Sequence, residues 1–347
     1  MVRHFLQKKR WYDYHHAHKV EAQSALRVIE SQHGKMNPLH QKEAHDYAHE
    51  VLGWSGYAPW LMVYSAVAGS FKSGWIPDNF YGRLVVPRIN GLYGQVSGAK
   101  SLSRKIFSAE NIPDIAYFVN GLFYTATWQV LPECNVKEYL FIERETIVFK
   151  LDKSEQGRGI FFLSQNNFSV AQMKRIGNGT FQSYINQHPF FAELISDSVA
   201  TLRITSVVND DGKTSARAAY LRLGRKNDTH VTWAANVIIP IDMTTGALHE
   251  KGCLPDFSSV FANHPDTGVM FDGLTVPRID DCFALVESLH KKYPFCRSIG
   301  WDVVVDDKDE IKIMEWNGEH NDIKFHEALQ GPCFADLGWE RLQITEE

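Results

Sequence analysis

The chain has 347 residues, of which 44% are hydrophobic, enough for one large core or two to three smaller ones. Its 36 Lys and Arg stand against 41 Asp and Glu, a formal charge of −5, so the basic surplus typical of nucleic-acid-binding proteins is absent and we expect no such partner. The five cysteines follow no CxxC spacing, which indicates neither a disulfide framework nor a zinc site.

The amino-terminal sequence lacks the apolar core of a signal peptide. The longest uncharged run, residues 58–71, is too short to span a bilayer and predicts a buried helix, so we expect no transmembrane segment. Together with the scattered cysteines, these features predict a cytoplasmic protein.

Residues 1–95 show apolar residues at helical spacing and are predicted to be mainly helical. Asn37 as a cap, Pro38 at the first position and Gly53 at the end predict a helix over about 38–52. His15 and His18 would lie one turn apart on a helix, which leaves two interpretations, a metal site or a solvated helix face. No acidic or cysteine partner stands nearby in a recognisable motif, which favours the solvated face.

Residues 74–91 contain Pro77, Pro87 and several glycines, and are predicted to be a connection with a boundary near residue 95. Lys105 then falls in a predicted short helix. Residues 115–124 read as a hairpin that turns at Asn120 and Gly121.

A strand over residues 146–149 ends in Lys150, and a loop with Gly157 and Gly159 leads to a second strand that begins at Ile160. A lysine at a strand end supplies a fixed positive charge, and glycines let backbone N–H groups approach phosphate oxygens. The spacing is neither a Walker A nor a Rossmann motif. Glycine loops also make ordinary hairpin turns, so a phosphate lid and a simple turn both remain open.

Two paired strands, residues 201–208 and 215–223, carry Arg203 and Arg222 among apolar neighbours. An arginine in such a place needs an anionic partner, either an acidic side chain of the core or a bound phosphate. A further hairpin is predicted over residues 237–251, and a helix over 278–292.

Residues 298–322 predict a final hairpin, with Asp302 on the first strand and Glu315 and Asn317 on the second. Glu315 and Asn317 project to the same side because side chains on a strand alternate. A two-residue loop would set Asp302 opposite Ile313 on that side, whereas a three-residue loop would turn it away. The three oxygen-bearing side chains then predict either a magnesium site or, as is common for acidic residues on a half-buried strand, a solvated edge or side chains with satisfied hydrogen bonds.

The order of these signals resembles that of the ATP-grasp superfamily, and the passages QSYINQHPFFAEL, SVATLRITSVV, HPDTGVMFDGLTVPR and IMEWN resemble its sugar-transfer-associated group. SRK, VFKLDKSEQGRGI and MEWN are also similar to ribosomal-protein glutamate ligases. The resemblance implies an α+β ATP-grasp fold, in which two α+β subdomains sandwich a nucleotide. We therefore expect an amino-terminal helical region over 1–95, a small subdomain with the phosphate lid over 96–185, and a large subdomain with the metal and substrate site over 186–347.

The resemblance also implies roles for individual residues, with ATP and Mg²⁺ as cofactors. Those implied to contact the nucleotide are Lys105, Lys150, Gly157, Gly159, Gln182, Ser183, Tyr184 and Ile185. Arg203 would reach the terminal phosphate and Arg222 a substrate or phosphate, whereas Asp302, Glu315 and Asn317 would hold magnesium. His264 and Thr267 belong to a motif of the group without an assigned role.

The sequence departs from the group's pattern at three residues in two places. Ala235 and Asn236 stand where a glycine pair is usual, and Gln182 replaces the usual hinge acid. The resemblance predicts an ATP-dependent carboxylate–amine ligase, acting on small molecules such as a sugar acid and an amino acid in polysaccharide biosynthesis. The alternatives are a phosphotransferase of the same fold and a non-catalytic nucleotide-binding component of a polysaccharide-assembly system.

Overall fold

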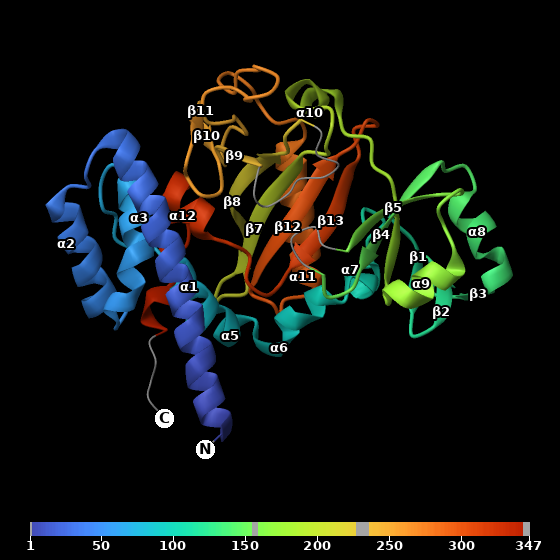
Figure 1. Ribbon diagram of the computed structural model, residues 1–347, viewed down its shortest axis with the longest axis horizontal. Coiled ribbons are helices and arrows are strands. Elements are labelled where there is room, and N and C mark those ends of the chain that lie inside the picture. The colour runs from blue at the N-terminus through green and yellow to red at the C-terminus, as the bar shows by residue number, and fades with distance from the viewer. Residues whose placement is uncertain (1, 155–158, 227–235, 343–347) are drawn as a thin grey trace.

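A computed structural model of the chain describes residues 2–154, 159–226 and 236–342. Two antiparallel β-sheets dominate it, and Figure 1 shows the larger one between the amino-terminal helices and the smaller sheet. None of the described helices is long and apolar enough to cross a membrane.

The first part of the chain is helical, as predicted. Its longer helices are α1 (Val2–His33), α2 (Pro38–Asp46) and α3 (Ala58–Ala68). Asn37 accepts a hydrogen bond from the amide of Leu39 and so caps α2, and a π-helical turn, Tyr47–Val51, continues it to the predicted end.

The segment predicted as a connection is instead folded into short helical pieces. These are α4 (Asp78–Phe80), the π-helical turn Tyr81–Val85, α5 (Val86–Ile89) and α6 (Gly91–Gly94), followed by α7 (Ser103–Phe107). Proline is compatible with the first turn of a helix, where its missing N–H is not needed, and Pro87 takes that place in α5.

The six-stranded sheet has the order β3-β2-β1-β6-β4-β5. Its strands are β1 (Asp114–Val119), β2 (Leu122–Thr125), β3 (Val130–Leu131), β4 (Thr146–Leu151), β5 (Ile160–Ser164) and β6 (Gly179–Ser183). Helices α8 (Glu133–Phe141) and α9 (Val170–Ile176) contribute side chains such as Leu140 and Met173 to one core with this sheet.

The seven-stranded sheet has the order β11-β10-β9-β8-β7-β12-β13. Its strands are β7 (Thr201–Val208), β8 (Thr214–Leu223), β9 (Val237–Pro240), β10 (Gly252–Cys253), β11 (Val260–Phe261), β12 (Ser298–Val305) and β13 (Ile311–Asn317). The predicted hairpin strand over 247–251 is not formed, because the chain there makes only isolated bridges before β10. Short helix α10 (Pro189–Leu194) precedes β7.

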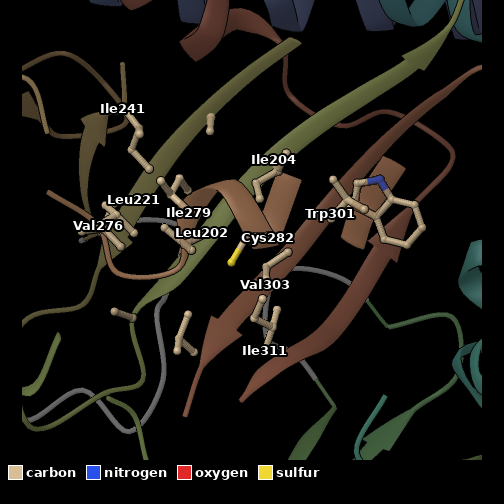
Figure 2. Packing of buried hydrophobic residues seen from close by; sticks show 14 of the residues in the cluster. Leu202, Ile204, Leu221, Ile241, Val276, Ile279, Cys282, Trp301, Val303 and Ile311 are labelled. Carbon is tan, nitrogen blue, oxygen red and sulfur yellow. The ribbon is translucent and has the colours of Figure 1, made fainter. Parts of the chain in front are cut away.

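Both faces of this larger sheet are covered. Helix α11 (Ile279–Lys292) packs on one face, where Figure 2 shows Ile279 and Cys282 against Leu202 and Val303 of the sheet. The amino-terminal helices and α12 (Lys324–Gln330) share a second core with residues of the same sheet, such as Tyr220. Two-sided burial explains why β7 and β12 are buried along their whole length.

Candidate functional site

A cleft of about 1120 Å³ lies between the two sheets and the amino-terminal helical region. Strands β4, β5 and β6 contribute to its lining, and so do β7, β8, β12 and β13. Of the predicted site residues, those lining it are Lys150, Gln182, Ser183, Tyr184, Ile185, Arg203, Arg222, Asp302, Glu315 and Asn317.

Lys150 links the two sheets across the cleft. Its ammonium group is buried and donates a hydrogen bond to the Met314 carbonyl of β13 at 3.1 Å. Burial lowers the pKa of Lys150, and the nearby Glu315 carboxylate opposes that effect. A buried cation bound to a backbone carbonyl is well suited to an additional anionic partner.

Gln182, which replaces the usual hinge acid, is bound to a carboxylate that the sequence analysis did not single out. Its amide donates to Asp114 of the neighbouring strand β1 at 2.8 Å. Burial raises the pKa of the Asp114 carboxyl, although hydrogen bonds from Gln182 and other residues oppose it. Asp114 is far from Gln182 in sequence, and only the pairing of β1 with β6 brings the two together.

The four residues that the resemblance implies as the adenine hinge, Gln182, Ser183, Tyr184 and Ile185, lie at the end of β6 and just beyond it. Ser183 ends the strand, and Tyr184 is largely exposed whereas Ile185 is buried. The cleft wall beside them is apolar, with Val148, Ile160, Phe162 and Met314. The end of β6 therefore lies beside an apolar surface, and a mostly apolar lining with a few polar groups is typical of small-molecule sites.

The register of the β12–β13 hairpin decides where Asp302 lies. Val303 pairs with Ile313, which is the register of the longer loop and not that of the two-residue loop. A β-bulge then inserts Met314 as one extra residue on β13, so that Asp302 stands directly opposite Glu315. Paired residues share a face of the sheet, and the two carboxylates therefore lie on one side of the hairpin.

Asp302 is held by two arginines, Arg203 on the neighbouring strand β7 and Arg222 on β8, one strand further along the sheet. One of its carboxylate oxygens lies 2.7 Å from Nε of Arg203 and 2.7 Å from a terminal nitrogen of Arg222. Burial alone would raise the pKa of the Asp302 carboxyl, but the two guanidinium groups hold it below its ordinary value. The acidic partner that the sequence left open for both arginines is thus Asp302, which itself lines the cleft.

Glu315 is bound by a lysine that the sequence analysis missed. Lys100 Nζ lies 2.9 Å from the Glu315 carboxylate and donates to the carbonyl of Ser154 at 2.8 Å. Asn317 stands two residues further along β13, opposite Gly300. Two carboxylates and an amide on adjacent strands, all lining the cleft, form a donor set whose hard oxygens suit Mg²⁺.

Lys105 does not line the cleft. It is exposed on α7, and its ammonium lies 5.2 Å from the centre of the Trp128 ring. The lysine of this segment that does line the cleft is Lys100, five residues earlier. The small residues Ser97, Gly98 and Ala99 before Lys100 were the available sequence signal, because they let the chain pass close to another segment.

The predicted lid is described at only one end. Gly159 has φ +90°, where a Cβ would crowd Ser154 and Leu151, so glycine is needed at this turn. Gly157 lies outside the described residues. So does Ala235, one of the two residues that stand where the group usually has a glycine pair. Asn236, the other member of that pair, is buried and lines the cleft.

His264 and Thr267 have structural contacts in a loop outside the cleft lining. The His264 ring is within hydrogen-bond distance of the Gly224 carbonyl, at 3.0 Å, and Thr267 donates to Leu194 at 2.9 Å. Asp266 between them binds Arg225 through two hydrogen bonds of 2.7 and 2.8 Å. The loop thereby anchors the chain just after β8.

The amino-terminal region also lines the cleft, which no motif in the sequence had indicated. Tyr14 from α1 and Gly82 contribute, together with His320 and Asp322 from the segment after β13.

His18 on α1 is mostly buried and accepts a hydrogen bond from the Trp60 indole at 3.1 Å, so the predicted solvated face was wrong for this histidine.

Residues 168–335, just under half of the chain, match the family model described as sugar-transfer associated ATP-grasp. The chain has the ATP-grasp fold. The resemblance to the sugar-transfer-associated group is confirmed over the matched residues. No curated protein matches the sequence.

Solved structures similar to this chain include the ATP-grasp ligase PsnB with a minimal precursor, at 12% identity and TM-score 0.42, covering 72% of this chain and 64% of PsnB. The biotin carboxylase domain of the Hydrogenobacter thermophilus 2-oxoglutarate carboxylase, with MgADP and bicarbonate, is 11% identical with a TM-score of 0.45. The alignment covers 73% of this chain and 47% of that domain. N5-carboxyaminoimidazole ribonucleotide synthetase from Thermotoga maritima is 11% identical with a TM-score of 0.42, and the alignment covers 77% of this chain and 58% of the synthetase. Each alignment spans less than two thirds of the solved chain.

Proposed function

We propose that this protein is an ATP- and Mg²⁺-dependent carboxylate–amine ligase that forms an amide bond through an acyl phosphate. The observation that supports this most directly is that Lys150, Arg203 and Glu315 line one cleft although they lie on different strands of two sheets. Cations on both sides of a cleft suit the phosphates of a nucleoside triphosphate, and the carboxylates between them suit the Mg²⁺ ion that accompanies it. The predicted division at residues 96–185 and 186–347 then corresponds to the two walls of the nucleotide site.

In this proposal ATP lies with its adenine against the apolar wall of Val148, Ile160 and Phe162. The backbone of Tyr184 and Ile185 at the hinge receives the adenine edge, so the replacement of the usual acid by Gln182 leaves this contact intact. Lys150 and Lys100 contact the phosphates. Lys100 takes the role that the resemblance gave to Lys105, which lies outside the cleft lining.

Asp302, Glu315 and Asn317 would hold Mg²⁺. When bound, the ion neutralises charge on the nucleotide phosphates and orients them. The protein's own task is then positioning: Arg203 and Arg222, fixed by Asp302, present positive charge to the phosphoryl group as it transfers to the substrate carboxylate. The amine attacks the carbonyl carbon of the acyl phosphate, and the same positive charge stabilises the tetrahedral oxyanion that forms. Collapse of this intermediate breaks the bond to the phosphate, which leaves as inorganic phosphate while the amine gives up a proton.

The donor and acceptor are proposed to be a sugar acid and an amino acid or other amine, in keeping with the name of the family model. The test is the release of ADP from ATP and Mg²⁺ in mixtures of uronic acids and amino acids. We expect release that requires both an acid and an amine. Release that needs only one acceptor identifies a phosphotransferase, and ATP binding without any turnover supports a binding component.

Glu315→Gln should abolish this turnover without loss of folding. Its matched control is Glu310→Gln on the same hairpin, because Glu310 is exposed, pairs with Lys312 and does not line the cleft. Equal activity of the two variants would contradict the proposed role of Glu315.

A further inference from the structure

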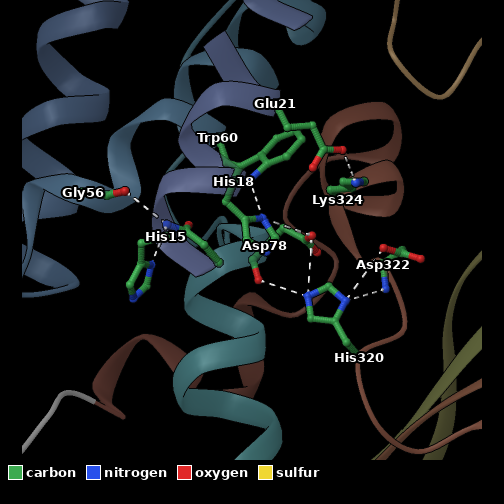
Figure 3. Close-up of polar contacts among 10 residues, drawn as sticks. His15, His18, Glu21, Gly56, Trp60, Asp78, His320, Asp322 and Lys324 are labelled. Carbon is green, nitrogen blue, oxygen red and sulfur yellow. Dashed lines mark hydrogen bonds and ion pairs between the residues drawn. The ribbon is translucent and has the colours of Figure 1, made fainter. Parts of the chain in front are cut away.

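A second group of metal-ligating side chains lies where the amino-terminal region meets the segment after β13. His18 comes from α1, Asp78 begins α4, and His320 follows β13, so three distant parts of the sequence converge (Figure 3). One Asp78 carboxylate oxygen lies 3.8 Å from Nδ1 of His18 and 3.5 Å from Nε2 of His320. One ligand atom from each residue falls within 4.8 Å of the other two.

The Asp78 carboxylate is the unusual member of this group. It is completely buried, and among the described residues neither of its oxygens has a hydrogen-bond partner. The imidazole nitrogens at 3.5 and 3.8 Å are beyond hydrogen-bond length. A buried carboxylate is costly unless it is paired and hydrogen-bonded or coordinates a metal.

We propose that His18, Asp78 and His320 bind a divalent transition-metal ion through two imidazole nitrogens and one carboxylate oxygen. Tetrahedral zinc with bonds of about 2.0–2.1 Å sets its ligand atoms about 3.3 Å apart, so the two Asp–His distances need to contract by only a few tenths of an ångström. Imidazole ligands favour zinc and its neighbours over magnesium. The site is distinct from the proposed Mg²⁺ site, with which it shares no ligand.

The other nitrogen of His320 already has an orienting partner. Its Nδ1 accepts a hydrogen bond from the Asp322 amide, and the Asp322 carboxylate lies 3.8 Å away. Metal binding at Nε2 moves the ring proton to Nδ1, which breaks the hydrogen bond from the Asp322 amide and leaves the nearby Asp322 carboxylate as the acceptor for that proton. Carboxylate–histidine–metal arrangements of this kind fix the ring and raise its basicity.

Both histidines have a contact that competes with the metal: Nε2 of His320 lies 3.3 Å from the Asp78 backbone carbonyl, and Nδ1 of His18 is bound by Trp60. The Trp60 indole donates to the same Nδ1 that faces Asp78, at 3.1 Å, so the metal must displace this hydrogen bond. Trp60→Phe removes the donor and should therefore tighten metal binding. His320 and Asp322 line the cleft, so a metal held here borders the space proposed for the substrates.

The experiment titrates the chelator-treated full chain with Co²⁺ in excess Mg²⁺ and then displaces the cobalt with Zn²⁺. We expect one Co²⁺ per chain with the visible d–d absorption of a tetrahedral site. His320→Ala and Asp78→Asn should weaken binding by more than about 100-fold, since loss of an outer-shell partner alone costs about 10–100-fold. His16→Ala is the matched control, because His16 is exposed on the same helix.

Each variant is first compared with the wild type by near-UV circular dichroism without metal. Should Asp78→Asn fail to fold, His320→Ala carries the test, because the His320 side chain is 30% exposed. Glu315→Gln should retain Co²⁺ binding even though it loses turnover, so this inference and the ligase proposal fail independently. Absence of the cobalt band, or a band unchanged in folded His320→Ala, would overturn the inference.

Discussion

The pairing of Asp302 with Arg203 and Arg222 predicts that Asp302→Asn lowers stability as well as activity. The substitution keeps the shape of the side chain but leaves two guanidinium groups, largely buried, without their carboxylate. Removing one partner of a buried ion pair costs about 3–5 kcal/mol, and we expect a loss of that order in the free energy of unfolding. Glu315→Gln should cost no more than about 1 kcal/mol, because the Glu315 side chain is 29% exposed and its pair with Lys100 is partly solvated.

The measurement is urea unfolding at pH 7, followed by tryptophan fluorescence. The depressed pKa of Asp302 sets the sign of the pH dependence: its contribution is complete above the unfolded-state pKa of about 3.9 and disappears as the pH falls through the lower folded-state value. The difference between wild type and Asp302→Asn should therefore shrink below about pH 4. A double-variant cycle with Arg203→Met should show strong coupling. An Asp302→Asn variant within about 1 kcal/mol of wild type at pH 7 would refute this account of the buried pair.

Three further outcomes are expected. Lys150→Met should weaken ATP binding by about 10- to 100-fold in calorimetry, since a charge-assisted contact contributes about 1.5–3 kcal/mol, whereas Lys105→Ala should leave it unchanged; equal effects would contradict the placement of the phosphates. Burial lowers the pKa of His290 to about 4, so only the unfolded chain takes up its proton as the pH falls from about 6.5 to about 4. The free energy of unfolding should fall by up to about 3 kcal/mol over that range, and His290→Asn should remove this part of the slope. Gly94→Ala should cost about 1–3 kcal/mol in thermal unfolding, because a Cβ there would overlap the Gly318 carbonyl, and an unchanged melting temperature would count against that contact.

Local pattern was sufficient for most elements of the fold. Asn37 and Pro38 mark the start of α2, and the Asn120–Gly121 turn joins β1 to β2, since both residues have positive φ. The short helices between residues 78 and 94 escaped prediction, because glycine and proline there signal turns as readily as first turns of helices.

Only part of the candidate site could be predicted from the sequence. Lys150, Arg203 and Glu315 stand out in the sequence because charged residues among apolar strand neighbours need partners. Lys100 and Asp114 do not stand out, since their partners Glu315 and Gln182 come from strands far along the chain.

The sequence by itself determined the longer strands, the amino-terminal helices and the residue types that can bind phosphate and a hard cation, because those follow from local periodicity and side-chain chemistry. Tertiary structure decided which of them meet. The bulge at Met314 turned Asp302 toward Glu315, and the docking of α1 brought His18 to Asp78 and His320. Register shifts and helix docking depend on packing between distant segments, and no local pattern encodes that packing.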